Sequence, residues 1–292
     1  MTTEDGAPDL PPGQVVDLPG RGETFVRELP GPSPEAPTVL LLHGWTATAD
    51  VTWFGCYSAL AEHSRGLALD HRGHGRGIRD PYPFRITDCA DDAAALLEVL
   101  GVPSAIVVGY SMGGPVAMQL WRRHRRRVDG LVLCATTACF TPSGPARARL
   151  VRMGALALLS RALPEAAVRS LGLRGLAWWS RQRPQVPWVT EQVSRASFRA
   201  ILEAGAEVGR WDGRQWTGSI DVPTAIVLTE QDQLVPPASQ RSLAASIAGT
   251  TVHPVDGDHA ACGLAVERFV PALLEATASV AERLGRRTQP AG

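Results

Sequence analysis

The sequence of 292 residues contains no lysine, so all 29 of its basic residues are arginine. This absence excludes chemistry that depends on a lysine, including Schiff bases and the phosphate-binding lysine of P-loops. The arginines are balanced by 29 acidic residues, which leaves a formal net charge of zero. A chain of balanced charge gives no reason to expect a nucleic-acid partner or stable insertion into a membrane.

Cysteine is also scarce, and the five cysteines form no C-x-x-C pair. They are Cys56, Cys89, Cys134, Cys139 and Cys262. We interpret them as reduced, mostly buried thiols and not as a disulfide framework or a zinc site. Residues 1–13 are acidic and contain proline and glycine, unlike the basic and apolar regions of a signal peptide. These two features predict a cytoplasmic protein with a flexible N-terminus.

Long apolar segments without breaks are absent as well. The longest uncharged run, residues 99–121, has enough residues to span a membrane, but glycines and prolines interrupt it repeatedly. We therefore expect a loop, a strand, a turn and a helix there. With 45% apolar and 20% charged residues, the chain has the composition of an ordinary globular protein with a sizeable core.

The most informative stretch lies inside this run. Residues 105–108 are a short apolar sequence typical of a buried strand, and a helical pattern begins by Pro115. The five residues between them that fit G-x-S-x-G are Gly109-Tyr110-Ser111-Met112-Gly113. In this strand–turn–helix arrangement a serine sits in a strained turn, and a Cβ two residues to either side would collide with backbone. The pattern predicts that Ser111 is a nucleophile.

The remaining pattern predicts an α/β fold. Expected strands cover residues 14–18, 24–29, 38–42, 66–69, 131–134, 223–229 and 251–255, the first two forming a hairpin. Expected helices cover residues 57–63, 87–100, 238–247 and 265–284, with Thr87 as the N-cap of the second. The basic run at residues 122–127 is interpreted as the solvated end of the helix after the serine.

Two further motifs occur in a fixed order around the serine motif. His43-Gly44-Trp45 follows the strand at 38–42, and residues 70–77 read D-x-R-G-x-G. Together with the serine motif, they resemble the α/β-hydrolase family. The resemblance implies a mostly parallel sheet flanked by helices, with the backbone N–H groups of Trp45 and Met112 as oxyanion donors. The resemblance also implies that the imidazole of His43 supports its loop through hydrogen bonds. Residues 70–77 would form a structural turn, in which no metal is expected.

The family order of a catalytic triad, serine then acid then histidine, is met by Ser111, Asp232 and His259. His253 is a weaker candidate for the base, because it lies within a strand pattern. Glu230 competes with Asp232 for the role of the acid, whereas Asp256 and Asp258 lie too close to His259 in sequence. The family pattern expects glycine where this chain has Thr229, a departure that weakens the assignment of Asp232.

The segment 140–218 is arginine-rich, lacks strand-like runs and holds five of the eight tryptophans. The resemblance implies that it is a helical cap inserted between strands 6 and 7. The core would then comprise residues 14–139 and 219–284, with a flexible tail at 285–292. Cap tryptophans and leucines would pack the cap and line a mostly apolar pocket over Ser111.

These expectations favour a cofactor-free serine hydrolase that cleaves small-to-medium hydrophobic esters through the triad of Ser111, Asp232 and His259. The same triad would also serve a cofactor-free haloperoxidase (perhydrolase) or a carbon–carbon bond hydrolase. A protein of this fold can also act as a ligand receptor or scaffold without catalysis. The motifs specify the machinery but not the substrate.

Overall fold

The computed structural model describes residues 8–140, 145–181 and 187–288. The eight strands are β1 (Gly13–Leu18), β2 (Gly22–Leu29), β3 (Thr38–Leu42), β4 (Arg65–Leu69), β5 (Ala105–Tyr110), β6 (Val128–Cys134), β7 (Thr224–Thr229) and β8 (Thr251–Val255). They form one sheet in the order β1-β2-β4-β3-β5-β6-β7-β8. β1 pairs with β2 and β2 with β4 in antiparallel fashion, and every other neighbouring pair is parallel.

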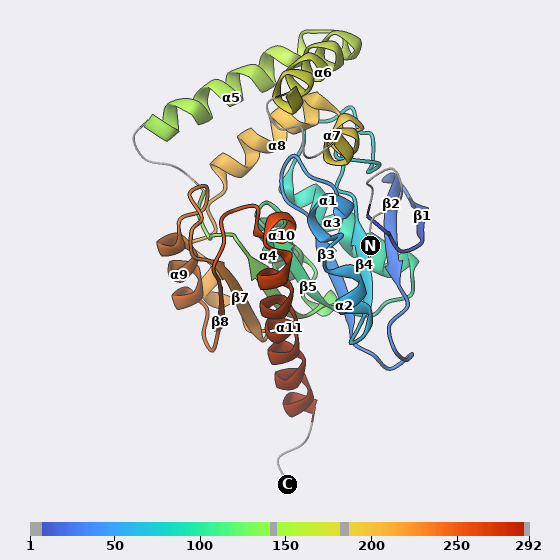
Figure 1. Ribbon diagram of the computed structural model, residues 1–292, viewed down its shortest axis with the longest axis vertical. Helices are drawn as coiled ribbons and strands as arrows, with labels where there is room; N and C mark the ends of the chain where they lie inside the picture. The colour runs from blue at the N-terminus through green and yellow to red at the C-terminus, as the bar shows by residue number, and fades with distance from the viewer. Residues whose placement is uncertain (1–7, 141–144, 182–186, 289–292) are drawn as a thin grey trace.

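Helices connect these strands and cover both faces of the sheet (Figure 1). They are α1 (Ala49–Trp53), α2 (Tyr57–Ala61), α3 (Ile86–Val99), α4 (Gly113–Arg123), α5 (Pro145–Arg161), α6 (Glu165–Arg181), α7 (Pro187–Ser194), α8 (Phe198–Arg210), α9 (Pro237–Ser246), α10 (Ala261–Leu264) and α11 (Val266–Thr288). The parallel sheet with flanking helices confirms the predicted α/β fold class.

Alternating side chains of the strands divide the interior into two apolar layers. Leu40 and Leu42 of β3 face a layer with α3, α4 and α9, whereas Val39 and Leu41 face a second layer with α1, α2 and α11. All four side chains are fully buried. Because neighbouring residues of a strand point to opposite faces, a sheet covered on both sides requires this continuous apolar run.

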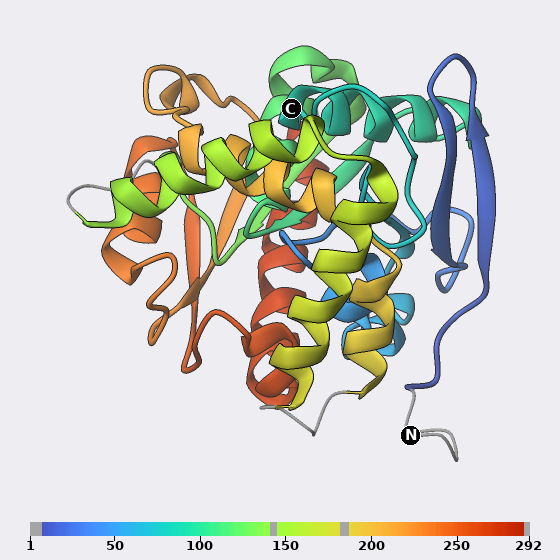
Figure 2. The same ribbon diagram turned by 90° about the horizontal axis from the view of Figure 1, so that it is seen from above.

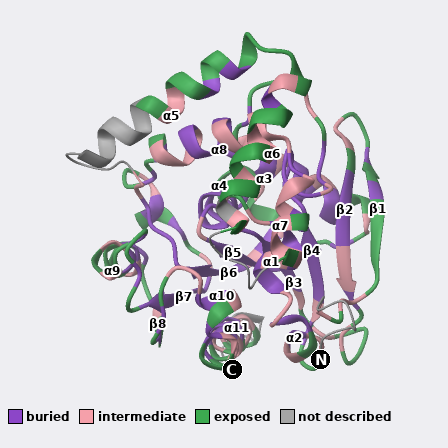
Figure 3. Cartoon of the chain, turned by 45° about the horizontal axis from the view of Figure 1, so that its top comes forward, coloured by how far each residue is buried: buried purple, intermediate pink, exposed green. Residues whose placement is uncertain are grey.

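The chain leaves the sheet after β6 and returns at β7, and the four helices α5–α8 lie in between. We call the segment between β6 and β7, which contains these four helices, the cap. Figure 1 shows the cap at one end of the molecule, opposite the C-terminal end of α11, and Figure 2 shows α5 and α6 outermost when that end is viewed from above. α8 lies beneath α5 and makes extensive contact with it. The outer cap surface is largely exposed, in contrast to the buried strands (Figure 3).

Several predicted boundaries were wrong. α3 begins at Ile86 with Arg85 at its N-cap position, so Thr87 is not the cap. α11 continues to Thr288, and only residues 289–292 of the predicted flexible tail lie outside the described residues. At the other end, the carbonyls of Pro11 and Pro12 accept hydrogen bonds from β2, so this part of the predicted flexible N-terminus is attached to the sheet.

The basic run at residues 122–127 is held by acidic and aromatic neighbours. Arg123 pairs with Asp91 at 2.8 Å, and Arg125 pairs with Asp221 at 3.1 Å while its guanidinium lies over the Trp121 ring. These contacts tie the end of α4 to the adjacent parts of the core. They agree with the interpretation of the run as the end of a helix.

Candidate active site

Ser111 occupies a strained turn between β5 and α4. Its φ of 52° lies in the left-handed region that residues other than glycine rarely adopt. Its N–H donates to the carbonyl of Cys134, and its carbonyl accepts from the hydroxyl of Thr136 at 2.8 Å. Hydrogen bonds on both sides of the residue therefore hold the turn.

The two glycines of the serine motif are required sterically. A Cβ on Gly109 would lie 2.3 Å from the carbonyl oxygen of Gly113, and a Cβ on Gly113 would lie 2.1 Å from that of Leu42. Both distances are far inside van der Waals contact. The close approach of the turn to β3 and to the start of α4 thus depends on glycine at both positions.

The structure brings the three residues predicted for the triad into one hydrogen-bonded chain. Ser111 Oγ lies 2.9 Å from Nε2 of His259, and Nδ1 of the same ring lies 2.7 Å from Oδ2 of Asp232. The residues follow β5, β8 and β7, all at the carboxyl edge of the parallel strands. The Asp232 side chain is fully buried, whereas that of His259 is 21% exposed. The histidine can therefore meet both a solvent-accessible reactant and a buried carboxylate.

Hydrogen bonds hold Asp232 in its ionised form. Burial alone would raise the pKa of its carboxyl group, but the hydrogen bond to His259, the charge of that ring and the N–H of Val235 together lower the pKa below its usual value. The N–H groups of Leu234 and Val235 both donate to Oδ1. A buried carboxylate with these partners can fix the orientation of the histidine ring.

Thr229, the departure from the family pattern, strengthens this arrangement. Its hydroxyl donates to Oδ2 of Asp232 at 2.9 Å, and the side-chain amide of Gln240 on α9 donates to the same hydroxyl at 2.9 Å. Both side chains are fully buried. Sequence reasoning missed these two residues, because no local pattern shows that a glutamine eleven positions away reaches this threonine.

The competing residues lie elsewhere. Glu230 is 46% exposed and lies 3.9 Å from Arg241, while Asp256 contacts Gln231 and Arg268. Asp258 accepts from the backbone N–H of Ala260.

His253, on β8, pairs with Thr251 and Glu275 and makes no contact with Ser111. His259, by contrast, does contact Ser111. A hydrogen bond from the Tyr110 hydroxyl to the carbonyl of His259 holds the backbone of this residue.

The loop after β3 passes directly over the nucleophile. A Cβ on Gly44 would lie 3.5 Å from that of Ser111. The next residue, Trp45, donates its indole N–H to the carbonyl of Ile201 in α8, which ties the loop to the cap. Within the described ranges, the backbone N–H groups of Trp45 and Met112 have no protein acceptor. They are available to a ligand.

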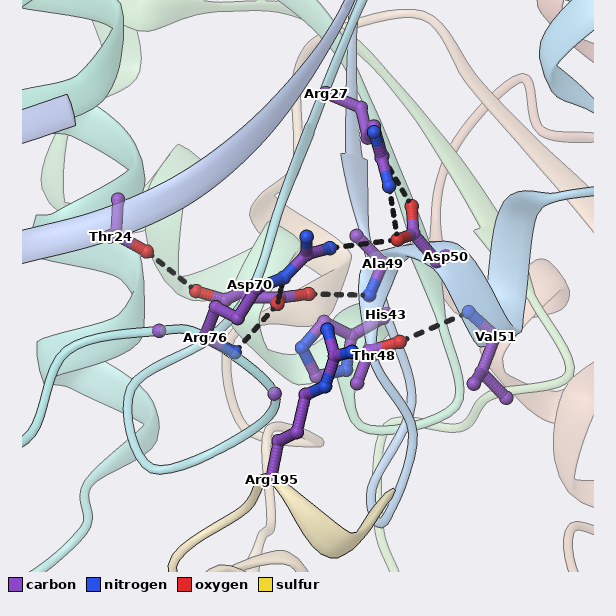
Figure 4. Close-up of polar contacts among 12 residues, drawn as sticks. Thr24, Arg27, His43, Thr48, Ala49, Asp50, Val51, Asp70, Arg76 and Arg195 are labelled. Atoms are coloured by element: carbon purple, nitrogen blue, oxygen red, sulfur yellow. Dashed lines mark hydrogen bonds and ion pairs between the residues drawn. The ribbon is translucent and has the colours of Figure 1, made fainter. Parts of the chain in front are cut away.

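A buried carboxylate fixes the far end of this loop, as Figure 4 shows. Asp70 accepts from the N–H of Ala49 and from the N–H of Arg76, both at 2.8 Å. Asp50 lies beside it and pairs with Arg27 and Arg76. Residues 70–77, predicted as a structural turn, therefore anchor the loop that carries Trp45. Among the described residues, no group of three or more His, Cys, Asp or Glu side chains is placed to hold a metal ion.

Three buried imidazoles lie beneath the same loop. His43 lies 4.4 Å from His71 and 5.3 Å from His74 between ring centroids, and all three side chains are fully buried. His43 braces the loop, since Nδ1 bonds to the carbonyl of Gly44 and Nε2 accepts from the N–H of His71. Burial lowers the pKa of His43 to about 4 and that of His74 to about 3, and burial with the neighbouring rings lowers that of His71 as well.

These histidines are expected to make the protein sensitive to acid. They stay neutral when folded but bind protons below about pH 6.5 when unfolded, so stability falls as pH drops from about 6.5 toward 4. Burial raises the pKa of Asp70 and partly opposes this effect. Between pH 5 and 6 we expect unfolding to take up two to three protons. The free energy of unfolding should therefore fall by about 3–4 kcal/mol for each unit by which the pH is lowered.

Urea titrations at several pH values measure this slope. His74→Gln removes one of these protons and should reduce the slope by about 1.4 kcal/mol per pH unit. His63→Gln, at an exposed position, should leave the slope unchanged. A slope near zero for the wild type would contradict neutral burial of the cluster.

The cap tryptophans are divided between packing and exposure. Trp211 and Trp216 pack edge to face at 5.8 Å, and Trp216 stacks on Trp121 of α4. Trp178 is 62% exposed, and Trp188 contacts Phe54 of the core at 5.6 Å. Only Trp188 therefore remains a candidate among these four for a pocket near the serine; the Trp179 side chain lies outside the described part.

A further apolar contact joins the loop after β3 to α5 and α8. The Trp45 ring and Met153 both pack against Gly205 of α8, where a Cβ would lie 2.5 and 2.2 Å from them.

Within the described chain, no helix is both long enough and apolar enough to cross a membrane.

The sequence is similar to those of known proteins. The sequence profile described as alpha/beta hydrolase fold matches residues 37–200, more than half of the chain. A putative carbamate hydrolase RutD of Azorhizobium caulinodans is 30% identical over 248 residues, 82% of this chain and 91% of that protein. A pimeloyl-[acyl-carrier protein] methyl ester esterase of Aeromonas hydrophila is 29% identical over 224 residues, 70% of this chain and 81% of that protein.

Solved structures show the same likeness. A hydrolase from Pseudomonas aeruginosa PA01 has a TM-score of 0.74 and 25% identity, covering 91% of this chain and 98% of the other. The enol-lactonase from Burkholderia xenovorans LB400 also has a TM-score of 0.74, at 23% identity, covering 91% of this chain and all of the other. The profile match and the 30% identical relative establish that this chain belongs to the α/β hydrolase fold family.

Proposed function

We propose that the protein is a serine hydrolase that cleaves small-to-medium hydrophobic carboxylic esters through an acyl-enzyme. The observation that carries the proposal is the unbroken chain from Ser111 Oγ through His259 to the buried carboxylate of Asp232. The named relatives include an esterase and a lactonase, both of which act on esters.

In the proposed first step, His259 Nε2 removes the proton of Ser111 Oγ as that oxygen attacks the ester carbonyl carbon. Asp232 keeps the Nδ1 proton directed toward itself and stabilises the imidazolium that forms. The N–H groups of Trp45 and Met112 would bind the oxyanion. Return of the proton to the alcohol oxygen releases the alcohol, and a water activated by the same histidine hydrolyses the acyl-enzyme. No cofactor or metal takes part in this mechanism.

The proposed preference for hydrophobic esters rests on apolar side chains around the loop that passes over Ser111 and around α10. Trp45 and Met153 lie on the α8 side, and Phe54 with Trp188 lies near α10, which follows His259. Burying an acyl chain there yields about 0.8 kcal/mol per methylene, or about fourfold in kcat/KM, until the space is filled.

A series of p-nitrophenyl esters from acetate to decanoate tests this preference directly. We expect kcat/KM to rise from acetate to a medium chain length and then to level off or fall. Highest activity on acetate, decreasing with each added carbon, would contradict the apolar site. The same panel should include a carbamate, because a relative carries the name carbamate hydrolase, and a peracid assay with halide for the haloperoxidase alternative. Turnover of the carbamate alone, or activity in the halide assay alone, would overturn the ester proposal.

A further inference from the structure

A cavity of about 440 Å³ lies between the cap and the loop after β4, and Ser111 is not among its lining residues. Helices α5, α6 and α8 line it together with residues 72–84. Six arginines face it: Arg72, Arg79, Arg161, Arg169, Arg195 and Arg199. Its three acidic lining residues are Asp80, Glu165 and Glu203. The lining therefore carries three more positive than negative charges, and its volume is that of a small-molecule site.

Carboxylates compensate four of the six arginines. Arg72 pairs with Asp80 and with the buried Asp92. Three pairs within or near the cap hold the others: Arg161 with Glu203 at 2.6 Å, Arg199 with Glu165 at 3.1 Å, and Arg195 with Glu191 at 2.7 Å. These pairs have a sufficient structural role, since Arg72 ties the loop before α3 to that helix and the other three pairs hold the cap together.

Arg79 and Arg169 differ from the other four, because neither pairs with a carboxylate anywhere in the described chain. Arg79 is directed by backbone carbonyls alone: those of Gly75 and Gly77 in its own loop and that of Arg195 in the cap. Partial burial and the charge of Arg169 lower the pKa of Arg79, whereas the charges of Asp70 and Glu165 act to raise it. Both side chains are exposed at the cavity, so their guanidinium groups can meet an anion that enters from solvent.

The start of α8 adds a separate anion-attracting feature. Ser197 is the N-cap of this 13-residue helix, accepts a hydrogen bond from the N–H of Ala200, and lines the cavity together with it. The positive end of the helix dipole therefore faces the same space. In addition, Nε of Arg199 is buried without a hydrogen-bond partner.

We propose that this cavity binds a small organic anion, with a carboxylate or phosphate group held by Arg79 and Arg169 at the N-terminus of α8. Tyr82 and the buried Phe84 offer apolar contact to the rest of the molecule. The site is separate from the proposed ester site. The two sites are connected through α8. Ala200 lines the cavity, and the carbonyl of the next residue, Ile201, accepts a hydrogen bond from the indole N–H of Trp45.

Isothermal titration of the full chain at low ionic strength tests the proposal with inorganic phosphate, phenyl phosphate and benzoate as separate probes. We expect 1:1 binding of at least one aromatic anion with a Kd of about 1 mM or lower. The phosphate and benzoate arms decide which group the site prefers. Arg169→Gln should weaken binding about tenfold, since a charge-assisted hydrogen bond is lost.

Arg152→Gln is the matched control, because it removes the same charge from an exposed position on α5 that does not line the cavity. This control should bind the probes as the wild type does, and neither variant should change p-nitrophenyl ester hydrolysis. Equal weakening by both variants would show diffuse attraction to the arginine-rich cap and overturn the proposal. The absence of binding by all three probes would overturn it as well.

Discussion

Replacing Ser111 by alanine is expected to abolish ester hydrolysis while leaving the fold intact. The hydroxyl oxygen is the atom that would form the acyl-enzyme, and its loss leaves the histidine with nothing to activate. Removing a nucleophile of this kind lowers kcat by about 10⁴ or more. Initial rates on a p-nitrophenyl ester measure the loss, and labelling by a fluorophosphonate probe should disappear together with it.

The matched control is Ser219→Ala, which removes an exposed serine from the turn before β7. It should keep both activity and labelling. Circular dichroism and urea titration would establish that the Ser111→Ala protein is folded. A folded Ser111→Ala protein that retained more than a few per cent of activity would show that another residue is the nucleophile.

The second large effect is expected from the acid. Asp232→Asn should lower kcat by about 10³–10⁴, because an amide cannot hold the ring of His259 in the tautomer that accepts the serine proton. The substitution also places an amide where Leu234, Val235 and Thr229 now donate to a carboxylate. The loss should therefore appear in kcat more than in KM.

Glu230→Gln provides the comparison, because this exposed residue follows β7 as Asp232 does but lies apart from His259. It should change kcat by less than about twofold, as is usual for surface substitutions remote from the reacting atoms. The opposite ranking of the two variants would show that Glu230 is the orienting acid and that the observed hydrogen bonds to Asp232 have no catalytic role.

The fold could be predicted from sequence because its strongest signals are local. The apolar run of β3 and the glycines around Ser111 each reflect a steric or burial requirement within a few residues. The positions of Ser111, Asp232 and His259 could be predicted as well, since the resemblance to the α/β-hydrolase family implies their order and each follows a recognisable strand. Helix ends were less predictable: α11 runs past Gly285 to Thr288, where a stop was expected.

What sequence could not supply was contact between distant segments. Thr229 looked like a defect, and only the fold shows that its hydroxyl joins Gln240 to Asp232. The cap tryptophans were expected to divide between packing and pocket, but only the fold shows that Trp211 and Trp216 are among those that pack, near α4. The arginine cavity gave no signal either, because Arg79 and Arg169 are ninety positions apart and meet only after the cap folds.

The placement of the proposed triad on three separate strand ends has a consequence for when the proposed activity would arise during synthesis. His259 lies 148 residues after Ser111, and the whole cap is made between them. A nascent chain can therefore complete the elbow and most of the parallel sheet long before any base exists to activate the serine. Contacts this distant in sequence form slowly, because the intervening chain must first be ordered. The proposed hydrolysis would thus report the docking of β7 and β8, the last strands of the sheet to be made, and would be absent until the final third of the chain has folded.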